Sequence, residues 1–258
     1  MKQTDTPRWR GGLIFAGVLL YLIFLIAQMP AAWLIARIPE DSPVHLLQAS
    51  GGPMRGEVAR VVWQVDAERI DLGALAWRWL PGELLGGRIG FRFELGRESN
   101  SLGGIVLLEQ NGWTLKNLQG PIDARILGFA SRAFGLLQPQ GSLMLDIVSL
   151  HHSARRIHGT ARVDWLGARS GLVDAALGDY SAQLNSDPDG RRAHFEIRTL
   201  QAGLSMDGAG EYFPGKNPQG TLRLRPPAGE GGNVYRPLLN ILGRPNAGGE
   251  WVLSMSPR

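Results

Sequence analysis

Apolar and polar residues alternate through most of the chain beyond residue 43. Between residues 88 and 95, Ile89, Phe91, Phe93 and Leu95 take every second position, and a glycine and charged residues take the others. A period of two places these four side chains on one face of a β-strand. Each such segment predicts a strand with one face in the core and the other in water. The alternation recurs in six further segments, at 61–65, 142–147, 160–165, 194–198, 221–225 and 250–253.

Two segments have helical spacing instead. Apolar residues recur every three or four positions within 122–137 and within 233–242, where Asn233 is a candidate cap and Pro237 falls in the first turn. The links between the predicted strands are too short for crossover helices, which favours antiparallel pairing. The 35 glycines and 16 prolines recur between the strands, as expected of turns.

An uncharged apolar run at 11–27 is long enough to cross a bilayer as a helix. Lys2, Arg8 and Arg10 precede it, and basic residues beside a first helix are retained on the cytoplasmic side. Trp33 is the expected interfacial anchor on the far side. A cleaved signal peptide is the competing interpretation, but no small-x-small cleavage site follows cleanly.

These patterns divide the chain into consecutive parts. Each helical segment is followed by a proline, a glycine and a strand, which indicates a degenerate internal repeat and two lobes that can share one sheet. We therefore predict a mainly β protein: an N-terminal transmembrane helix followed by an elongated, curved antiparallel β-sheet with two short amphipathic helices. The parts are a cytoplasmic tail (1–10), the membrane helix (11–36), a linker (37–44) and two periplasmic β lobes (45–150 and 151–258).

Composition narrows the class of function. The chain has 27 Lys and Arg against 23 Asp and Glu, a net charge of +4 without a dense basic stripe, which argues against nucleic-acid binding. It has no cysteine, which excludes disulfides and thiolate metal sites. Stability must come from a packed core, and the part beyond the predicted anchor is long enough to form one.

The segment 210–217 is the nearest approach to a phosphate-binding loop. Its Gly215 and Lys216 fit, but Asn217 replaces the hydroxyl residue that would hold magnesium, and Pro214 removes an amide from the cradle. We interpret the segment as a surface turn.

A histidine cluster is the nearest approach to a metal site. His151, His152 and His158 lie close in sequence to Asp146 and Asp164. Neighbouring strand residues point to opposite faces, however, so one face offers at most two of the histidines. We expect no metal here.

No nucleophilic site stands out either. Cysteine is absent, no Gly-x-Ser-x-Gly elbow occurs, and the carboxylates are spread through turn-like sequence. We expect no catalytic, cofactor-binding or metal-binding residue, and no enzyme. Six tryptophans in or near the alternating segments are predicted either to pack in the core or to line a concave apolar groove: Trp63, Trp77, Trp79, Trp113, Trp165 and Trp251.

Four short segments carry a resemblance to a known family. They are 29–34 (Met-Pro-Ala-Ala-Trp-Leu), 75–87 with its Trp-x-x-x-Pro-x-x-Leu-Leu-x-Gly block, 159–165 (Gly-Thr-Ala-Arg-Val-Asp-Trp) and 177–180 (Leu-Gly-Asp-Tyr). With the basic tail and single helix, they resemble protein N of the bacterial type II secretion system over nearly the whole chain. The chain departs from that family at 51–56, where members usually carry Gly-Thr-x-Trp-Ser-Gly.

The resemblance implies an inner-membrane component of the machine that exports folded periplasmic proteins, with a periplasmic domain and no catalytic residues. It implies partners among the other inner-membrane platform components and in the connection to the outer-membrane secretin, with a separate cytoplasmic ATPase as the power source. It does not identify the exported substrates or the oligomeric state.

Two rival functions stay open at this point. The chain also looks like the membrane-anchored AsmA-like proteins, which handle lipids in an apolar β groove. Residues 89–95 distinguish the secretion component from the lipid-handling protein. If their apolar side chains pack on other protein atoms, assembly within the secretion system is favoured; if they line an open trough, lipid handling is favoured. An anchored hydrolase would need a compact polar pocket that the sequence does not indicate.

Overall fold

The computed structural model describes residues 21, 28–31, 33, 39, 42–65, 68–97, 100–130 and 132–255. The predicted tail at 1–10 and most of the predicted membrane helix at 11–36 lie outside these residues. Among the residues described, none forms a helix of the length and apolar character needed to span a membrane. The membrane helix therefore stays a prediction of the sequence.

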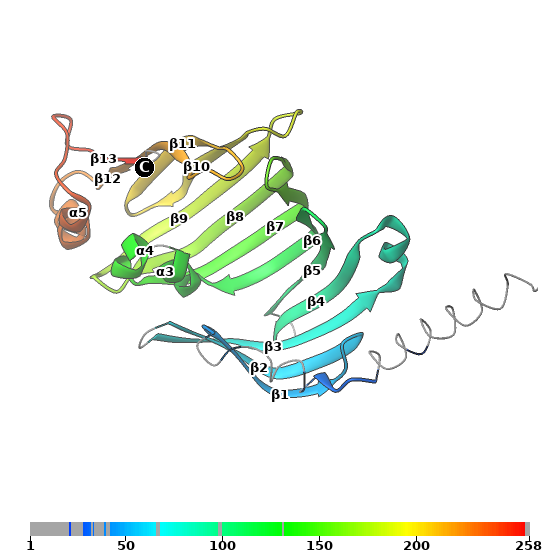
Figure 1. Cartoon of the computed structure of the whole chain (residues 1–258). Helices are drawn as coiled ribbons and strands as arrows, with labels where there is room; N and C mark the ends of the chain where they lie inside the picture. The colour runs from blue at the N-terminus through cyan, green and yellow to red at the C-terminus, as the bar shows by residue number, and fades with distance from the viewer. Residues whose placement is uncertain are drawn as a thin grey trace, which may run out of the picture.

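The described residues contain thirteen strands in a single antiparallel sheet, whose spatial order is the order of the sequence (Figure 1). Each of the seven alternating segments lies in one of these strands, apart from the first residue of two of them, so the predicted elongated antiparallel sheet is confirmed. The strands are β1 (Val44–Gly51), β2 (Arg55–Val65), β3 (Glu68–Leu80), β4 (Ile89–Arg97), β5 (Asn100–Glu109), β6 (Gly112–Asp123), β7 (Pro139–Ser153), β8 (Ile157–Ser170), β9 (Val173–Ser186), β10 (Ala193–Ala202), β11 (Ser205–Tyr212), β12 (Gln219–Arg225) and β13 (Trp251–Met255).

The predicted boundary between the two lobes, at residue 150, falls inside β7. Strand β7 pairs with β6 on one side and β8 on the other, so the sheet runs through the boundary without interruption. Figure 1 shows the sheet curling between β4 and β6, so that β1–β4 lie at an angle to β6–β9.

The first predicted helical segment, 122–137, begins two residues later than expected and is broken into three short pieces. These are η2 (Ala124–Ile126), α3 (Leu127–Ala130) and α4 (Arg132–Leu137). Ile122 and Asp123 pair with β7 instead, and the Asp123 carboxylate accepts a hydrogen bond from the amide of Arg125 at 2.9 Å, which caps η2. Strand pairing outcompetes local helical spacing at these two positions.

The second predicted helical segment, 233–242, becomes η3 (Glu230–Tyr235) and α5 (Arg236–Leu242), with Pro237 in the first turn of α5 as expected. Asn233 lies inside η3 and does not cap a helix, so that detail of the prediction is wrong. One further helical turn, η1 (Pro81–Gly86), joins β3 to β4.

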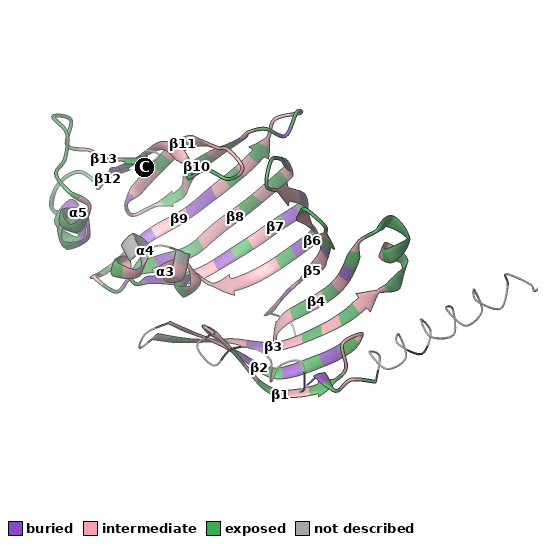
Figure 2. Cartoon of the chain, in the orientation of Figure 1, coloured by how far each residue is buried: buried purple, intermediate pink, exposed green. Residues whose placement is uncertain are grey.

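The core is built on one side of the sheet. One cluster of buried side chains includes Tyr180, Leu224 and Leu239, where η3 and α5 pack with residues of β8, β9 and β12. A second includes Leu118 and Ile147 on β6 and β7. Figure 2 shows the buried residues interspersed with half-buried ones along the strands, as expected of a sheet whose apolar face carries little covering layer.

Candidate functional site

The hollow side of the sheet is an apolar trough. The strand register builds this surface, as the seven neighbouring strands β7–β13 show. Residues that lie opposite one another across these strands form a row without a polar side chain: Leu145, Val163, Ala182, Ile197, Gly208, Leu222 and Leu253. The row of their immediate chain neighbours faces the other way and is mostly polar: Asp146, Arg162, Gln183, Glu196, Ala209, Thr221 and Ser254. The alternation of the sequence thus becomes one apolar and one polar surface.

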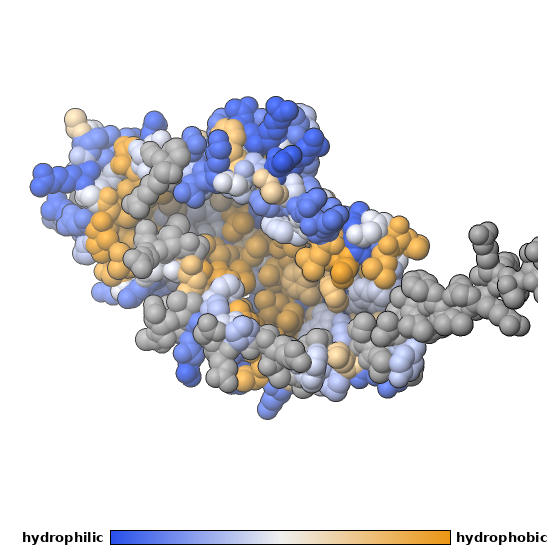
Figure 3. All heavy atoms as spheres, viewed as in Figure 1, coloured by the Kyte–Doolittle hydropathy of each residue, from blue (hydrophilic) through white to orange (hydrophobic). Residues whose placement is uncertain are grey.

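The apolar trough is open. Phe91, Phe93 and Leu95 on β4 lie on it half-buried, and Ile89 is 48% exposed. Figure 3 shows the hollow lined by hydrophobic residues, seen from the side viewed in Figure 1. With thirteen strands about 4.8 Å apart, the trough follows a contour of about 58 Å across the strands.

Helical segments close parts of the trough. The ring of Trp63 on β2 stacks on that of Phe129 in α3, with centroids 5.7 Å apart and planes 4° from parallel. Because β2 is four strands away from β6 in the sheet, this stack spans the curl. At the other end, Leu238 and Leu239 of α5 are buried in the cluster around Tyr180.

The six tryptophans lie on the trough side by register. The indole N–H groups of three of them are held at the backbone: Trp77 donates to the Pro53 carbonyl at 3.2 Å, Trp165 to Gln140 at 3.0 Å and Trp251 to Gly243 at 3.1 Å. Their rings are half-buried. These rings pack against the sheet and also line the trough. Packing in the core and lining an apolar groove, the two interpretations that the sequence left open, are therefore compatible.

The histidines divide between the two faces. His151 and His158 lie opposite each other on the polar face, whereas His152 lies in the trough, stacked on Trp113 at 5.3 Å and hydrogen-bonded to the Tyr212 hydroxyl at 3.0 Å. Within the described part of the chain, no group of three or more side chains that could hold a metal ion comes together.

The segment 210–217 continues β11 into the turn before β12. The amide of Lys216 donates to the Phe213 carbonyl at 2.9 Å, and the Lys216 ammonium lies 5.7 Å from the centre of the Phe213 ring. The predicted turn is therefore confirmed after Tyr212, whereas residues 210–212 belong to β11.

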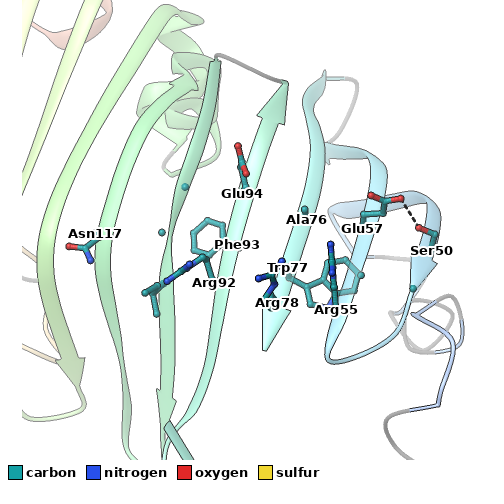
Figure 4. Close-up of a pocket in the computed structure, with 15 residues that line it drawn as sticks. Ser50, Arg55, Glu57, Ala76, Trp77, Arg78, Arg92, Phe93, Glu94 and Asn117 are labelled. Atoms are coloured by element: carbon teal, nitrogen blue, oxygen red, sulfur yellow. Dashed lines mark hydrogen bonds between the residues drawn. The ribbon is translucent and has the colours of Figure 1, made fainter. Parts of the chain in front are cut away.

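The polar face has a furrow of about 840 Å³ over β1–β6 (Figure 4). Arg55, Arg78 and Arg92 lie opposite one another on three neighbouring strands, and Glu57 and Glu94 lie in the adjacent row. Each glutamate accepts a hydrogen bond from a serine on the neighbouring strand. Among the residues described, no ion pair joins these arginines to an acid, so three like charges stand side by side.

The motif at 177–180 has a structural explanation. Gly178 has a left-handed φ of 128°, and a Cβ there would lie 2.2 Å from the Gln201 carbonyl oxygen. The Tyr180 hydroxyl lies 2.7 Å from the carbonyl oxygens of both Leu177 and Leu204. Burial raises the pKa of Tyr180 above its ordinary value, so the hydroxyl stays a donor.

Comparison with known proteins identifies the family. The model of the family "Type II secretion system (T2SS), protein N" matches residues 42–254, which include the motifs at 75–87, 159–165 and 177–180. Neither a curated protein nor a solved structure matches the chain significantly. Because the family match extends over most of the chain, from before β1 to β13, the chain belongs to the type II secretion system protein N family.

Proposed function

We propose that this chain is a structural component of the type II secretion system, held in the inner membrane by one N-terminal helix with its sheet in the periplasm. Family membership makes it a component of that system. The apolar run at 11–27 and the basic residues before it support the membrane location and the orientation. In this proposal the chain catalyses nothing and acts by contact with other inner-membrane platform components and with the connection to the secretin.

An unpaired edge of the sheet is the observation that carries this mechanism. Strand β13 pairs with β12, has no second neighbour among the residues described, and contains neither charge nor proline. Such an edge accepts a strand from a partner through main-chain hydrogen bonds. The opposite edge, β1, is distorted at Gln48, which has a left-handed φ of 56°. We therefore place the contact at β13.

Proline scanning tests the edge. Proline at a β13 position whose N–H faces away from β12 removes a donor to the partner and leaves the β12 ladder intact. Alanine at the same position is the matched control, and a parallel scan of β1 is the second. We expect site-specific cross-links from β13 to platform components to be lost with proline only. Unchanged cross-linking to every partner contradicts the mechanism.

Deletion in the source bacterium tests the function itself. If exported enzymes accumulate in the periplasm and a plasmid copy restores their export, the secretion role is supported. If export is untouched, the proposed role is wrong.

A second candidate function, lipid handling, is supported by the open apolar trough. Phe91 and Phe93 line it half-buried, although Phe93 also packs against the buried cluster that includes Leu118 and Ile147, and a contour of about 58 Å exceeds the length of an acyl chain. In this alternative, acyl chains lie in the trough and the polar face stays in water.

One pair of substitutions tests this alternative. Ala182→Arg places a charge in the trough, whereas Gln183→Arg places the same side chain on the polar face one residue later. We expect lipid that copurifies with the full chain to be lost in the first variant and kept in the second. Equal lipid content in both variants counts against lipid binding in the trough.

A further inference from the structure

The turn between β3 and β4 exposes leucines at its tip. Leu84 is 49% exposed and Leu85 is 96% exposed, and no residue of η1 is buried. Ile89 and Leu108 follow at the adjoining ends of β4 and β5, directly opposite each other and nearly half exposed. These four residues form the leucine tip. In Figure 3 hydrophobic surface covers the position that η1 occupies in Figure 1.

The tip is bounded by a proline and a glycine, and its charged side chains are paired. Pro81 opens η1, and Gly87 ends it in a left-handed conformation with a φ of 70°. Its two charged side chains neutralise each other, because Arg88 contacts the Glu83 carboxylate at 2.6 Å. An exposed apolar tip with a balanced charge enters a lipid interface without desolvating a lone ion.

The place of the tip on the sheet points to the membrane. By register, the β3 end that leads into η1 lies beside the start of β2, at the β1–β2 turn. The described residues among 28–33, which follow the apolar run at 11–27 in the last part of the predicted membrane helix, lie at this same end of the strands in Figure 1. The two segments thus approach the same side of the molecule.

We propose that the leucine tip inserts into the interface of the bilayer that holds the N-terminal helix, as a second attachment point. This inference rests on the membrane location proposed above. A narrow tip of four side chains is small for a stable protein interface, which buries about 800 Å² per partner. Ile89 and Leu108 also belong to the trough side, so insertion brings the rim of the trough to the bilayer surface.

A fluorescent label tests the proposal, because the chain has no cysteine and any introduced one is unique. Gly82 is the labelling site in the tip, since an added Cβ there meets no atom within 4 Å and both leucines are kept. The reference sites are Leu200 on β10, which is 52% exposed, and Leu19 within the predicted span. Each full-length cysteine variant carries an environment-sensitive nitrobenzoxadiazole label in phosphatidylethanolamine and phosphatidylglycerol vesicles.

Quenching by nitroxide lipids decides the result. We expect the label in Gly82→Cys to be quenched by a nitroxide near the headgroup, the label in Leu19→Cys by one deep in the acyl region, and the label in Leu200→Cys by neither. Adding Leu84→Ser and Leu85→Ser should reduce quenching at position 82 to the level at position 200. The same two-serine change leaves quenching at position 19 intact.

Three results overturn the proposal. Quenching at position 82 equal to that at position 200, with position 19 still quenched, rejects the tip and leaves the membrane helix standing. A blue shift at position 82 without nitroxide quenching assigns the tip to a protein contact. Absence of quenching at position 19 rejects the membrane location on which the tip depends.

Discussion

The hydroxyl of Tyr180 joins two neighbouring parts of the sheet, and its removal should destabilise the fold measurably. It lies 2.7 Å from the Leu177 carbonyl on its own strand and 2.7 Å from the Leu204 carbonyl between β10 and β11. The Leu177 oxygen also accepts from the amides of Gly203 and Leu204, whereas no hydrogen bond other than that from Tyr180 is seen to the Leu204 oxygen among the residues described. Tyr180→Phe therefore leaves one buried carbonyl without a donor.

The expected loss of stability follows from the one carbonyl that Tyr180→Phe leaves without a donor, that of Leu204. Losing a buried hydrogen bond and stranding its acceptor costs about 2 kcal/mol. The Phe ring itself fits, since Tyr180 is 3% exposed and its ring packs in the cluster with Leu224 and Leu239. For a unit of this size, about 2 kcal/mol lowers the melting temperature by roughly 4–8 °C. Urea unfolding of the full chain in detergent, followed by circular dichroism, measures the change.

Tyr212→Phe is the matched control. Its hydroxyl bonds to His152 at 3.0 Å in a half-buried site, where water can replace the lost partner. We expect a change of about 0.5 kcal/mol in that variant. Equal effects at the two tyrosines would refute the reasoning that the stranded carbonyl dominates.

Three further predictions concern charge and backbone. Arg78→Glu places an acid between two like charges and should stabilise the sheet by about 0.5–1 kcal/mol, an effect that shrinks in high salt. Gly178→Ala should destabilise the fold by about 2 kcal/mol or more, because the added Cβ meets backbone atoms at a residue with positive φ. Gly82→Ala is the control and should change the stability little, because an added Cβ there meets no atom within 4 Å. Thermal melting of the two variants measures the difference. A hydrogen bond from Arg225 lowers the pKa of Glu250 below its ordinary 4.5. Its stabilising contribution is therefore complete above pH 4.5 and lost as pH falls through the lower folded value, so the urea midpoints of wild type and Glu250→Gln should differ at neutral pH and converge in acid.

Local patterns predicted seven of the thirteen described strands, for a physical reason. Alternation is a property of neighbours in the chain, and the seven alternating segments lie in β2, β4, β7, β8, β10, β12 and β13, apart from the first residue of two of them. The sequence predicted where the helical segments lie but not where they begin. Ile122 and Asp123 fit the helical spacing of the segment, yet they pair with β7, which follows the helical segment in the chain. Asn233 is a residue type that is favoured at helix N-caps, but η3 begins before it, at Glu230.

The functional surfaces depended on pairing between distant residues. Arg55, Arg78 and Arg92 are more than ten positions apart in sequence and become a row only through register. The exposure of Leu85 was equally hidden, because a Leu-Leu pair after a proline is as compatible with a buried turn as with an exposed one. No local signal separates these outcomes.

By itself, the sequence determined that the chain is a series of two-faced antiparallel strands, and its motifs indicated the secretion family that the family match establishes. Only the tertiary structure decided that the apolar faces line a curved, open trough, that β13 offers an unpaired edge, and that leucines project from the β3–β4 turn. The reason is that alternation specifies two faces without specifying what covers either one. Covering depends on curvature and register, which join residues far apart in the chain.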